Sequence, residues 1–249
     1  MRKCGVLTKF RRRGTPVYAG DRVVEKGVIV DLGLNDYAEV YKLQQILVAG
    51  RRDGVLVNDL FLVTEHHSVF TLGRRGGAEN LVVSKEFLLE KNIQIVQIER
   101  GGDITYHGPG QLVVYPIIDL RKAGLGVTDY VYMLEEVMVK LAAGCDVDAV
   151  RDSRNHGVWV AGKKLGSVGI AIRHGITFHG FAFNVNLSLT PFSWVNPCGL
   201  QGVVMTSLSR ERGQSICMDQ VKFLLAETLS GVFSAGLQVE TEEYLNVAM

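Results

Sequence analysis

The sequence lacks three features that define large classes of proteins. It contains no run of 18 or more apolar residues, which argues against a transmembrane helix. It has no excess of charge of one sign, because 27 basic residues are balanced by 26 acidic ones, and this argues against a dedicated nucleic-acid binder. Its first residues are charged and have no hydrophobic core, unlike a secretory signal, so we expect a cytoplasmic protein.

Cysteine is scarce and scattered. The four cysteines are Cys4, Cys145, Cys198 and Cys217, and none has a partner at the spacing of a zinc site. Without a secretion signal, a reduced setting is favoured over a disulfide framework. Histidine offers no metal site either, because the adjacent His66 and His67 point to opposite sides of a strand. We therefore expect no bound metal.

Glycine, in contrast, is abundant, with 28 residues in 249. Residues 157–164 nearly match the phosphate-binding pattern G-x-x-x-x-G-K-[ST]. Lys164 stands where the hydroxyl that holds magnesium is required, and the interior Val-Trp-Val is typical of a strand rather than an open loop. A nucleotide-binding loop is not expected here.

The chain is predicted to fold as an α+β protein in one domain. Residues 1–26 hold six basic residues and no acidic one within the first 20, and we interpret them as a basic extension before a domain over 27–249. Helical spacing predicts helices from Asp36 to Gly50 and over 84–91, 128–141 and 219–229. Strands are expected at 28–30, 60–64, 68–72, 93–98 and 112–118, and three more within 157–186. Because strands and helices do not alternate regularly, we expect one mixed sheet with flanking helices.

Residues 100–111 carry four glycines and one proline among side chains of several chemistries. A backbone that turns repeatedly beside polar side chains suits the wall of a ligand site. An ordinary loop between two strands is the alternative, and the density of glycine favours the site.

Asn196-Pro197-Cys198-Gly199 places a cysteine on a turn, since Pro197 fixes its backbone and Gly199 permits a sharp bend. Lys164 lies 34 residues earlier. If the two side chains met, the ammonium group would lower the pKa of the thiol and favour the nucleophilic thiolate. A buried structural cysteine and a solvated lysine are the alternatives.

Four segments together resemble the lipoyl(octanoyl) transferases: residues 100–111, 164–169, 178–186 and 196–199. The resemblance extends over roughly 28–235. His67 and Ser68 stand where the family commonly has two prolines, and Ser167 stands where it often has alanine.

The resemblance implies the fold of the catalytic domains of biotin and lipoate protein ligases, and an octanoyltransferase catalytic domain over 27–249. It implies Cys198 as the nucleophile that carries the acyl group as a thioester, and Lys164 as the lysine that lowers its pKa. The implied substrate-binding residues are Arg100, Gly101, Gly102, Asp103, Ile104, Thr105, Tyr106, His107, Ser167, Val168, Gly169, Gly180, Phe181 and Ala182. His179 and Asn184 are auxiliary candidates, and for His107 and His179 a structural role stays open.

The implied activity is transfer of an octanoyl or lipoyl group to a lysine, the first step of endogenous protein lipoylation. The donor would be octanoyl-acyl carrier protein, whose phosphopantetheine bears the acyl group. The acceptors would be lipoyl domains of 2-oxoacid dehydrogenase subunits and the glycine-cleavage H protein. No cofactor of the enzyme's own, nucleic acid or membrane is implied.

Two alternatives remain at this point. An ATP-dependent lipoate or biotin ligase would share the fold but would need no nucleophilic cysteine. A non-enzymatic acyl-binding module would have a pocket without turnover.

Overall fold

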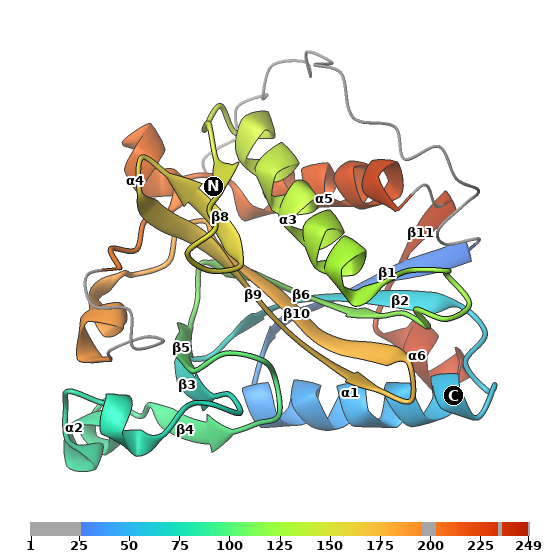
Figure 1. Cartoon of the computed structure of the whole chain (residues 1–249), viewed down its shortest axis with the longest axis horizontal. Helices are drawn as coiled ribbons and strands as arrows, with labels where there is room; N and C mark the ends of the chain where they lie inside the picture. Colours follow the sequence, from blue (N-terminus) through green and yellow to red (C-terminus); the bar gives the residue numbers. More distant parts are fainter. Residues whose placement is uncertain (1–25, 196–202, 234–235, 249) are drawn as a thin grey trace.

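The centre of the molecule is a mixed β-sheet of eight strands (Figure 1). The computed structural model describes residues 26–195, 203–233 and 236–248. In spatial order the strands are β11 (Gly236–Glu240), β1 (Lys26–Asn35), β2 (Asp59–His66), β6 (Gln111–Ile117), β10 (Ile176–Asn184), β9 (Lys163–Arg173), β8 (Gly157–Val160) and β7 (Val150–Arg151). β1 runs parallel to both of its neighbours, and the remaining pairs are antiparallel.

Helices cover both faces of this sheet (Figure 1). α3 (Val127–Gly144) and α5 (Met218–Val232) pack on one face, where Leu134 and Leu225 belong to a large apolar core. α1 (Tyr37–Arg52) covers the other face, and Leu245 of α6 (Glu243–Ala248) joins the core beneath it. These layers confirm the predicted α+β class with flanking helices.

A second, smaller sheet corrects the expectation of a single one. β3 (Val69–Leu72) lies between β4 (Gln94–Gln97), which is parallel to it, and β5 (Ile104–His107), which is antiparallel. Its own apolar core takes in Leu88 from α2 (Lys85–Glu90) and Phe192 from the 3-10 helix η2 (Thr190–Trp194). β5 lies inside the glycine-rich stretch, so part of that predicted loop is a strand.

Two of the four predicted helix starts, at Asp36 and Ser84, are confirmed by side-chain caps. Asp36 accepts a hydrogen bond from the amide of Ala38, and Ser84 accepts one from the amide of Phe87. The predicted end of the first helix at Gly50 is wrong, because α1 continues to Arg52 and is closed by Asp53. Glycine is tolerated inside a helix when the following residues still make helical bonds.

The C-terminal part contains two elements beyond the predicted helix over 219–229. β11 pairs in parallel with the start of β1, and α6 follows it. Short α4 (Leu208–Arg212) precedes α5 and begins at Ser207, whose hydroxyl accepts from the amide of Arg210. No helix among the described residues is long and apolar enough to span a bilayer. The predicted extension, residues 1–26, lies almost entirely outside the described residues, which begin at Lys26.

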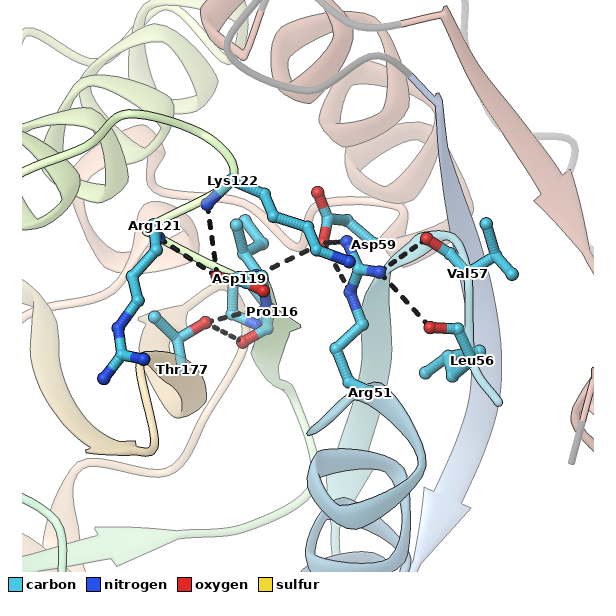
Figure 2. Close-up of polar contacts among 10 residues, drawn as sticks. Arg51, Leu56, Val57, Asp59, Pro116, Asp119, Arg121, Lys122 and Thr177 are labelled. Carbon is cyan, nitrogen blue, oxygen red and sulfur yellow. Dashed lines mark hydrogen bonds and ion pairs between the residues drawn. The ribbon is translucent and has the colours of Figure 1, made fainter. Parts of the chain in front are cut away.

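A buried ion pair joins the end of α1 to the start of β2 (Figure 2). Nε and Nη2 of Arg51 donate to Oδ1 of Asp59 at 3.0 and 2.6 Å, while Nη1 donates to the carbonyls of Leu56 and Val57 at 3.2 and 2.6 Å. The same carboxylate oxygen accepts from the amide of Asp119 after β6, at 3.3 Å. Burial raises the pKa of Asp59, and the adjacent guanidinium offsets part of that rise. This cluster fixes the C-terminal end of α1 to the start of β2 and to the end of β6, and none of its members is a predicted site residue.

Candidate active site

The floor of the candidate site is a strip of small residues shared by β9 and β10. Gly169 is paired with Gly180, and Ser167 with Ala182. A Cβ atom on Gly180 would lie 2.1 Å from the carbonyl oxygen of Val114, and one on Gly169 would lie 3.1 Å from Cδ of Arg100. Gly180 therefore requires glycine, whereas Gly169 could carry a Cβ only if Arg100 or the backbone of Gly101 shifted. Both glycines line a cavity, here called the trough, that lies along the two strands.

The glycine-rich segment forms a roof over this trough. Arg100 is buried, and its Nη2 donates to the carbonyl and hydroxyl of Thr71 on β3 at 2.7 and 2.9 Å. The amide of Gly101 donates to the carbonyl of Ile170 at 2.9 Å, which attaches the roof to β9. Asp103 accepts from the amide of Ile104 at 2.6 Å and from the side chain of Asn80 at 2.8 Å. Arg100 and Asp103 thus fix this segment to the small sheet, and Gly101 fixes it to the large one.

Lys164 stands near the start of β9 with only 7% of its surface exposed. Its amide donates to the carbonyl of Val204, and its carbonyl accepts from the amide of Thr206, both at 2.8 Å. The β8–β9 pairing shifts register between Val158 and Trp159, beside Lys164. Nζ of Lys164 lies 5.3 Å from the centre of the Trp159 ring. The ammonium group is therefore enclosed. The backbone of Lys164 is held by Val204 and Thr206, which follow residues 196–202 in the chain.

A chain of buried hydrogen bonds links His107 to the segment beside Lys164. Nδ1 of His107 donates to Oε1 of Gln111 at 2.7 Å, and Nε2 of Gln111 donates to Oδ1 of Asn184 at 2.9 Å. Asn184 then donates to the carbonyl of Thr206 at 2.9 Å. Burial, followed by the positive charge that a protonated His66 would carry, lowers the pKa of His107 to about 3. His107 is therefore neutral at physiological pH and cannot supply a proton there.

His179 is held in an unusual conformation for a residue inside a strand. Its φ is +54°, and its ring stacks on Tyr41 of α1 with centroids 5.4 Å apart. Its backbone amide donates to Oε1 of Gln44 at 2.7 Å. Neither ring nitrogen has a hydrogen-bond partner among the described residues. Burial, with further contributions from Arg100 and Arg173, lowers the pKa of His179 to about 3. The ring is therefore neutral, and it is held in place by packing alone.

Nearly all of the residues predicted for the site line one cavity. Those found there are Lys164, Arg100, Gly101, Gly102, Asp103, Ile104, Thr105, His107, Ser167, Val168, Gly169, His179, Gly180, Phe181 and Ala182. Tyr106 instead packs its ring against Phe70 and Phe192 in the core of the small sheet. Asn184 is reached through Gln111 and does not line the cavity. Cys198 lies outside the described residues, so the structure does not place it.

Sequence reasoning missed several lining residues. They are Tyr37, Val113, Tyr115, Asn155, Trp159, Phe192, Val203 and Met205. Most are apolar or aromatic, and in sequence such residues look the same as ordinary core residues. Gln111 was also missed as a connecting residue, although it is the last residue of the glycine-rich stretch.

His66 is buried and His67 is exposed, as expected for neighbours on a strand. Nε2 of His66 accepts from the hydroxyl of Tyr115 at 2.7 Å, and Nδ1 donates to the carbonyl of Asn35 at 3.2 Å. Within the described ranges, no three His, Cys, Asp or Glu side chains form a group able to hold a metal ion.

Comparison with known proteins identifies the family. Residues 36–230 match the model of the lipoyl protein ligase A/B catalytic domain. The chain belongs to this family. Within it, the chain is 55% identical to an octanoyltransferase of Desulfotalea psychrophila over 82% of this chain and 93% of that protein. It is 41% identical to an octanoyltransferase of Caldicellulosiruptor saccharolyticus over 86% of this chain and 92% of that protein. The resemblance drawn from the four sequence segments is confirmed.

Solved structures confirm the predicted fold. A lipoate-protein ligase A bound with ATP superposes with a TM-score of 0.67 at 16% identity, covering 90% of this chain and 92% of that one. A bi-partite lipoate protein ligase from Thermoplasma acidophilum gives 0.68 at 17% identity, covering 90% and 91%. A biotin protein ligase from Aquifex aeolicus in complex with biotin and ATP gives 0.52 at 13% identity, covering 83% and 70%.

Proposed function

We propose that this protein is an acyltransferase that moves an octanoyl group from the phosphopantetheine thiol of acyl carrier protein to a lysine of a lipoyl domain. The observation that carries the proposal is the buried Lys164 beside a trough of small residues, in a chain whose relatives at 41–55% identity are octanoyltransferases. Lipoyl domains of 2-oxoacid dehydrogenase subunits and the glycine-cleavage H protein are the proposed acceptors.

The proposed nucleophile is the thiolate of Cys198. The described residues nearest to it in the chain support this role, because Phe192 and Val203 line the cavity and Val204 and Thr206 bond to the backbone of Lys164. An ammonium group close to a thiol favours the thiolate. Lys164 is the proposed source of that charge.

The proposed reaction has two steps. Sγ of Cys198 attacks the thioester carbonyl, the carbon–sulfur bond to the carrier breaks, and the ammonium of Lys164 gives its proton to the departing thiolate. The neutral amine of the acceptor lysine then attacks the acyl-enzyme, its proton passes to Lys164, and the cysteine thiolate leaves. A thioester and an amine become an amide and a thiol, so the reaction needs neither ATP nor a cofactor of the enzyme's own. Such covalent catalysis predicts ping-pong kinetics.

The trough supplies the binding energy for the acyl chain. Seven methylene and methyl groups buried at about 0.8 kcal/mol each give roughly 5–6 kcal/mol before the costs of ordering. In the strip from Ser167 to Gly169, opposite Gly180 to Ala182, the pairs Ser167–Ala182 and Gly169–Gly180 are small and line this path.

An ATP-dependent ligase has the same fold, so the fold alone does not separate the two activities. Intact-mass measurement after incubation with octanoyl-acyl carrier protein separates them, because the proposed thioester adds about 126 Da. The Cys198→Ser variant should form no thioester, so it should show no thioester mass increase and should transfer no octanoyl group. Cys145→Ala is the matched control, because Cys145 is buried beneath α3 and burial raises its pKa to about 11. Full transfer by Cys198→Ser would refute the proposed nucleophile.

The role of Lys164 is tested by the rate of thiol alkylation against pH. Lys164→Ala should move the alkylation profile of Cys198 to higher pH and reduce transfer. Lys163→Ala is its control, since Lys163 pairs with Glu211 instead of lining the cavity. An unchanged profile in Lys164→Ala would rule out the proposed coupling, as would an equal shift in both variants.

A further inference from the structure

His179 combines two features that each cost stability. A non-glycine residue at φ +54° occupies the left-handed region, which is unfavourable inside a strand. Its two ring nitrogens are buried without a hydrogen-bond partner, as is Nε2 of Gln44, the residue that binds its backbone. Features of this kind persist where function requires them.

The left-handed conformation redirects the side chain. Alternation along β10 would place residues 178 and 179 on opposite faces of the sheet. Instead, the rings of Phe178 and His179 lie 4.9 Å apart, and His179 stacks on Tyr41 at an interplanar angle of 13°. His179 therefore lies on the α1 face, where it lines the cavity.

The imidazole is fixed on several sides. Tyr41 lies face to face with it, and the hydroxyl of Tyr41 donates to Glu99, which holds that ring in place. Tyr115 packs edge-on with centroids 6.4 Å apart. Because Tyr41, Tyr115 and Phe178 contact its ring, His179 forms a fixed wall.

This wall stands at the opposite end of the trough from Lys164. His179 is paired with Ile170 on β9, six residues beyond Lys164, which corresponds to roughly 20 Å between the two rows of Cα atoms. The side chain of Lys164 covers part of this distance, because a Cβ on Gly157 would lie 3.1 Å from Cε of Lys164, and Gly157 is paired with Ser167. Ser167 is three residues before Ile170, which leaves roughly 10 Å between the end of the lysine side chain and the level of His179. An extended eight-carbon chain covers roughly 9 Å, given carbon–carbon bonds of about 1.5 Å. Gly101 bonds to the carbonyl of the same Ile170, so the roof also reaches β9 at this level. A chain whose carbonyl lies beside Lys164 therefore runs along the small-residue strip toward His179.

We propose that His179 is the residue that limits acyl chain length, by closing the distal end of the trough with a fixed imidazole. This inference rests on the proposed octanoyl transfer and adds which residue selects the eight-carbon chain. His179 acts here as a specificity-determining contact of the terminal methyl group. It takes no part in proton transfer, because its lowered pKa makes the imidazole a weak base.

The test is a chain-length series of hexanoyl-, octanoyl-, decanoyl- and dodecanoyl-acyl carrier protein, measured as kcat/KM for transfer to a lipoyl domain. His179→Gly removes the wall and suits φ +54°, and His179→Asn shortens it while tolerating the same backbone. Each additional methylene that finds room is worth about fourfold. We therefore expect the decanoyl-to-octanoyl ratio to rise about tenfold in His179→Gly and by less in His179→Asn.

His174→Gly is the matched control. His174 has φ +56° in the exposed turn between β9 and β10, so the same substitution there changes the same hairpin without touching the cavity. Its decanoyl-to-octanoyl ratio should equal that of the unmodified protein, and thermal melting confirms that each variant is folded.

The outcomes separate the two proposals. If the unmodified protein transfers octanoyl groups but accepts dodecanoyl equally well, or if folded His179→Gly and His179→Asn keep the original ratio, the chain-length inference fails alone. If the unmodified protein transfers no acyl group of any length, the proposed function fails. Calorimetric binding of free six- to twelve-carbon fatty acids to the unmodified protein and to both His179 variants then tests the wall by itself: a preference for eight carbons that His179→Gly removes supports it, and equal binding of all lengths overturns it.

Discussion

Acid should destabilise this protein well above the pH at which most carboxylates titrate, because three histidines are buried in neutral form. The pKa of His66 is lowered to about 4, mainly by burial, and those of His107 and His179 to about 3. In the unfolded chain the pKa of each histidine returns to roughly 6.5. Between about pH 6.5 and 4 the unfolded state therefore binds more protons than the folded state. Stability is fully present above pH 6.5 and decreases as the pH falls below it.

The size of the effect follows from the number of protons. One proton contributes about 1.4 kcal/mol per pH unit, so each histidine removes about 2 kcal/mol between pH 7 and pH 5, and the three together remove about 5–6 kcal/mol. That is a large part of the 5–15 kcal/mol by which domains are usually stable.

Urea unfolding, followed by circular dichroism at several values between pH 7.5 and 5, measures this directly. His66→Gln, His107→Gln and His179→Asn each replace a titrating ring with a neutral amide. Each variant should show about two thirds of the pH dependence of the unmodified protein, whatever its stability at pH 7.5. A free energy of unfolding that stays constant from pH 6.5 to 5 would show that these rings are not buried and neutral as described.

Three further substitutions test the packing that positions the site. Arg51→Ala should lower the free energy of unfolding by about 3–5 kcal/mol, because it leaves Asp59 buried without its charge partner; a loss below 1 kcal/mol in urea titration would contradict this. Gly180→Ala should force Cβ against the carbonyl of Val114 and separate β10 from β6, so the variant should lose both folding stability and transfer activity. A melting temperature equal to that of the unmodified protein would contradict this. Gly231→Ala, with no atom within 4 Å of the added Cβ, should instead raise stability by up to about 1 kcal/mol in the same melting assay, and a lower melting temperature would contradict the open space around it.

A helix or strand could be predicted from the sequence where its own residues carry a regular apolar pattern. α3 and α5 bury one regular apolar stripe, so their existence was evident from spacing alone, although the ends differed by a few residues. β11 has mostly exposed side chains and exists because it pairs with β1, so no local alternation marks it. β5 is only four residues long and is bounded by glycines, which makes it look like a loop.

The division of the strands into two sheets could not be predicted from the sequence, for a different reason. Strands of either sheet have similar compositions, and pairing between distant segments is decided by the whole fold. β3 follows β2 after two residues, yet it joins the small sheet with β4 and β5 while β2 stays in the large one. The expectation of one sheet failed at this point.

The candidate site was predictable where glycine density or a family motif marked it, and not where ordinary side chains completed it. Gly180 is required because an added Cβ would lie 2.1 Å from the carbonyl oxygen of Val114, and Gly169 is favoured by a contact of 3.1 Å with Arg100. Such constraints leave a signal in the sequence. Tyr37 stacks on His107 with centroids 5.7 Å apart, but at the start of an amphipathic helix it looks like any core residue. Its contribution depends on α1 crossing the sheet above β10, which only the three-dimensional structure shows.

The hydrogen-bond chain from His107 to Thr206 explains why motifs so far apart in sequence belong to one site. Gln111 ends the glycine-rich stretch, Asn184 ends β10, and Thr206 follows the segment that contains Cys198, while the amide of Thr206 bonds to the carbonyl of Lys164. Each side-chain amide in this chain uses both its oxygen and its nitrogen, so shifting one member leaves buried polar groups unpaired on the others. The position of the lysine backbone is thus tied to the roof of the trough and to the strand that carries His179. The candidate site is therefore held together by hydrogen bonds between three segments.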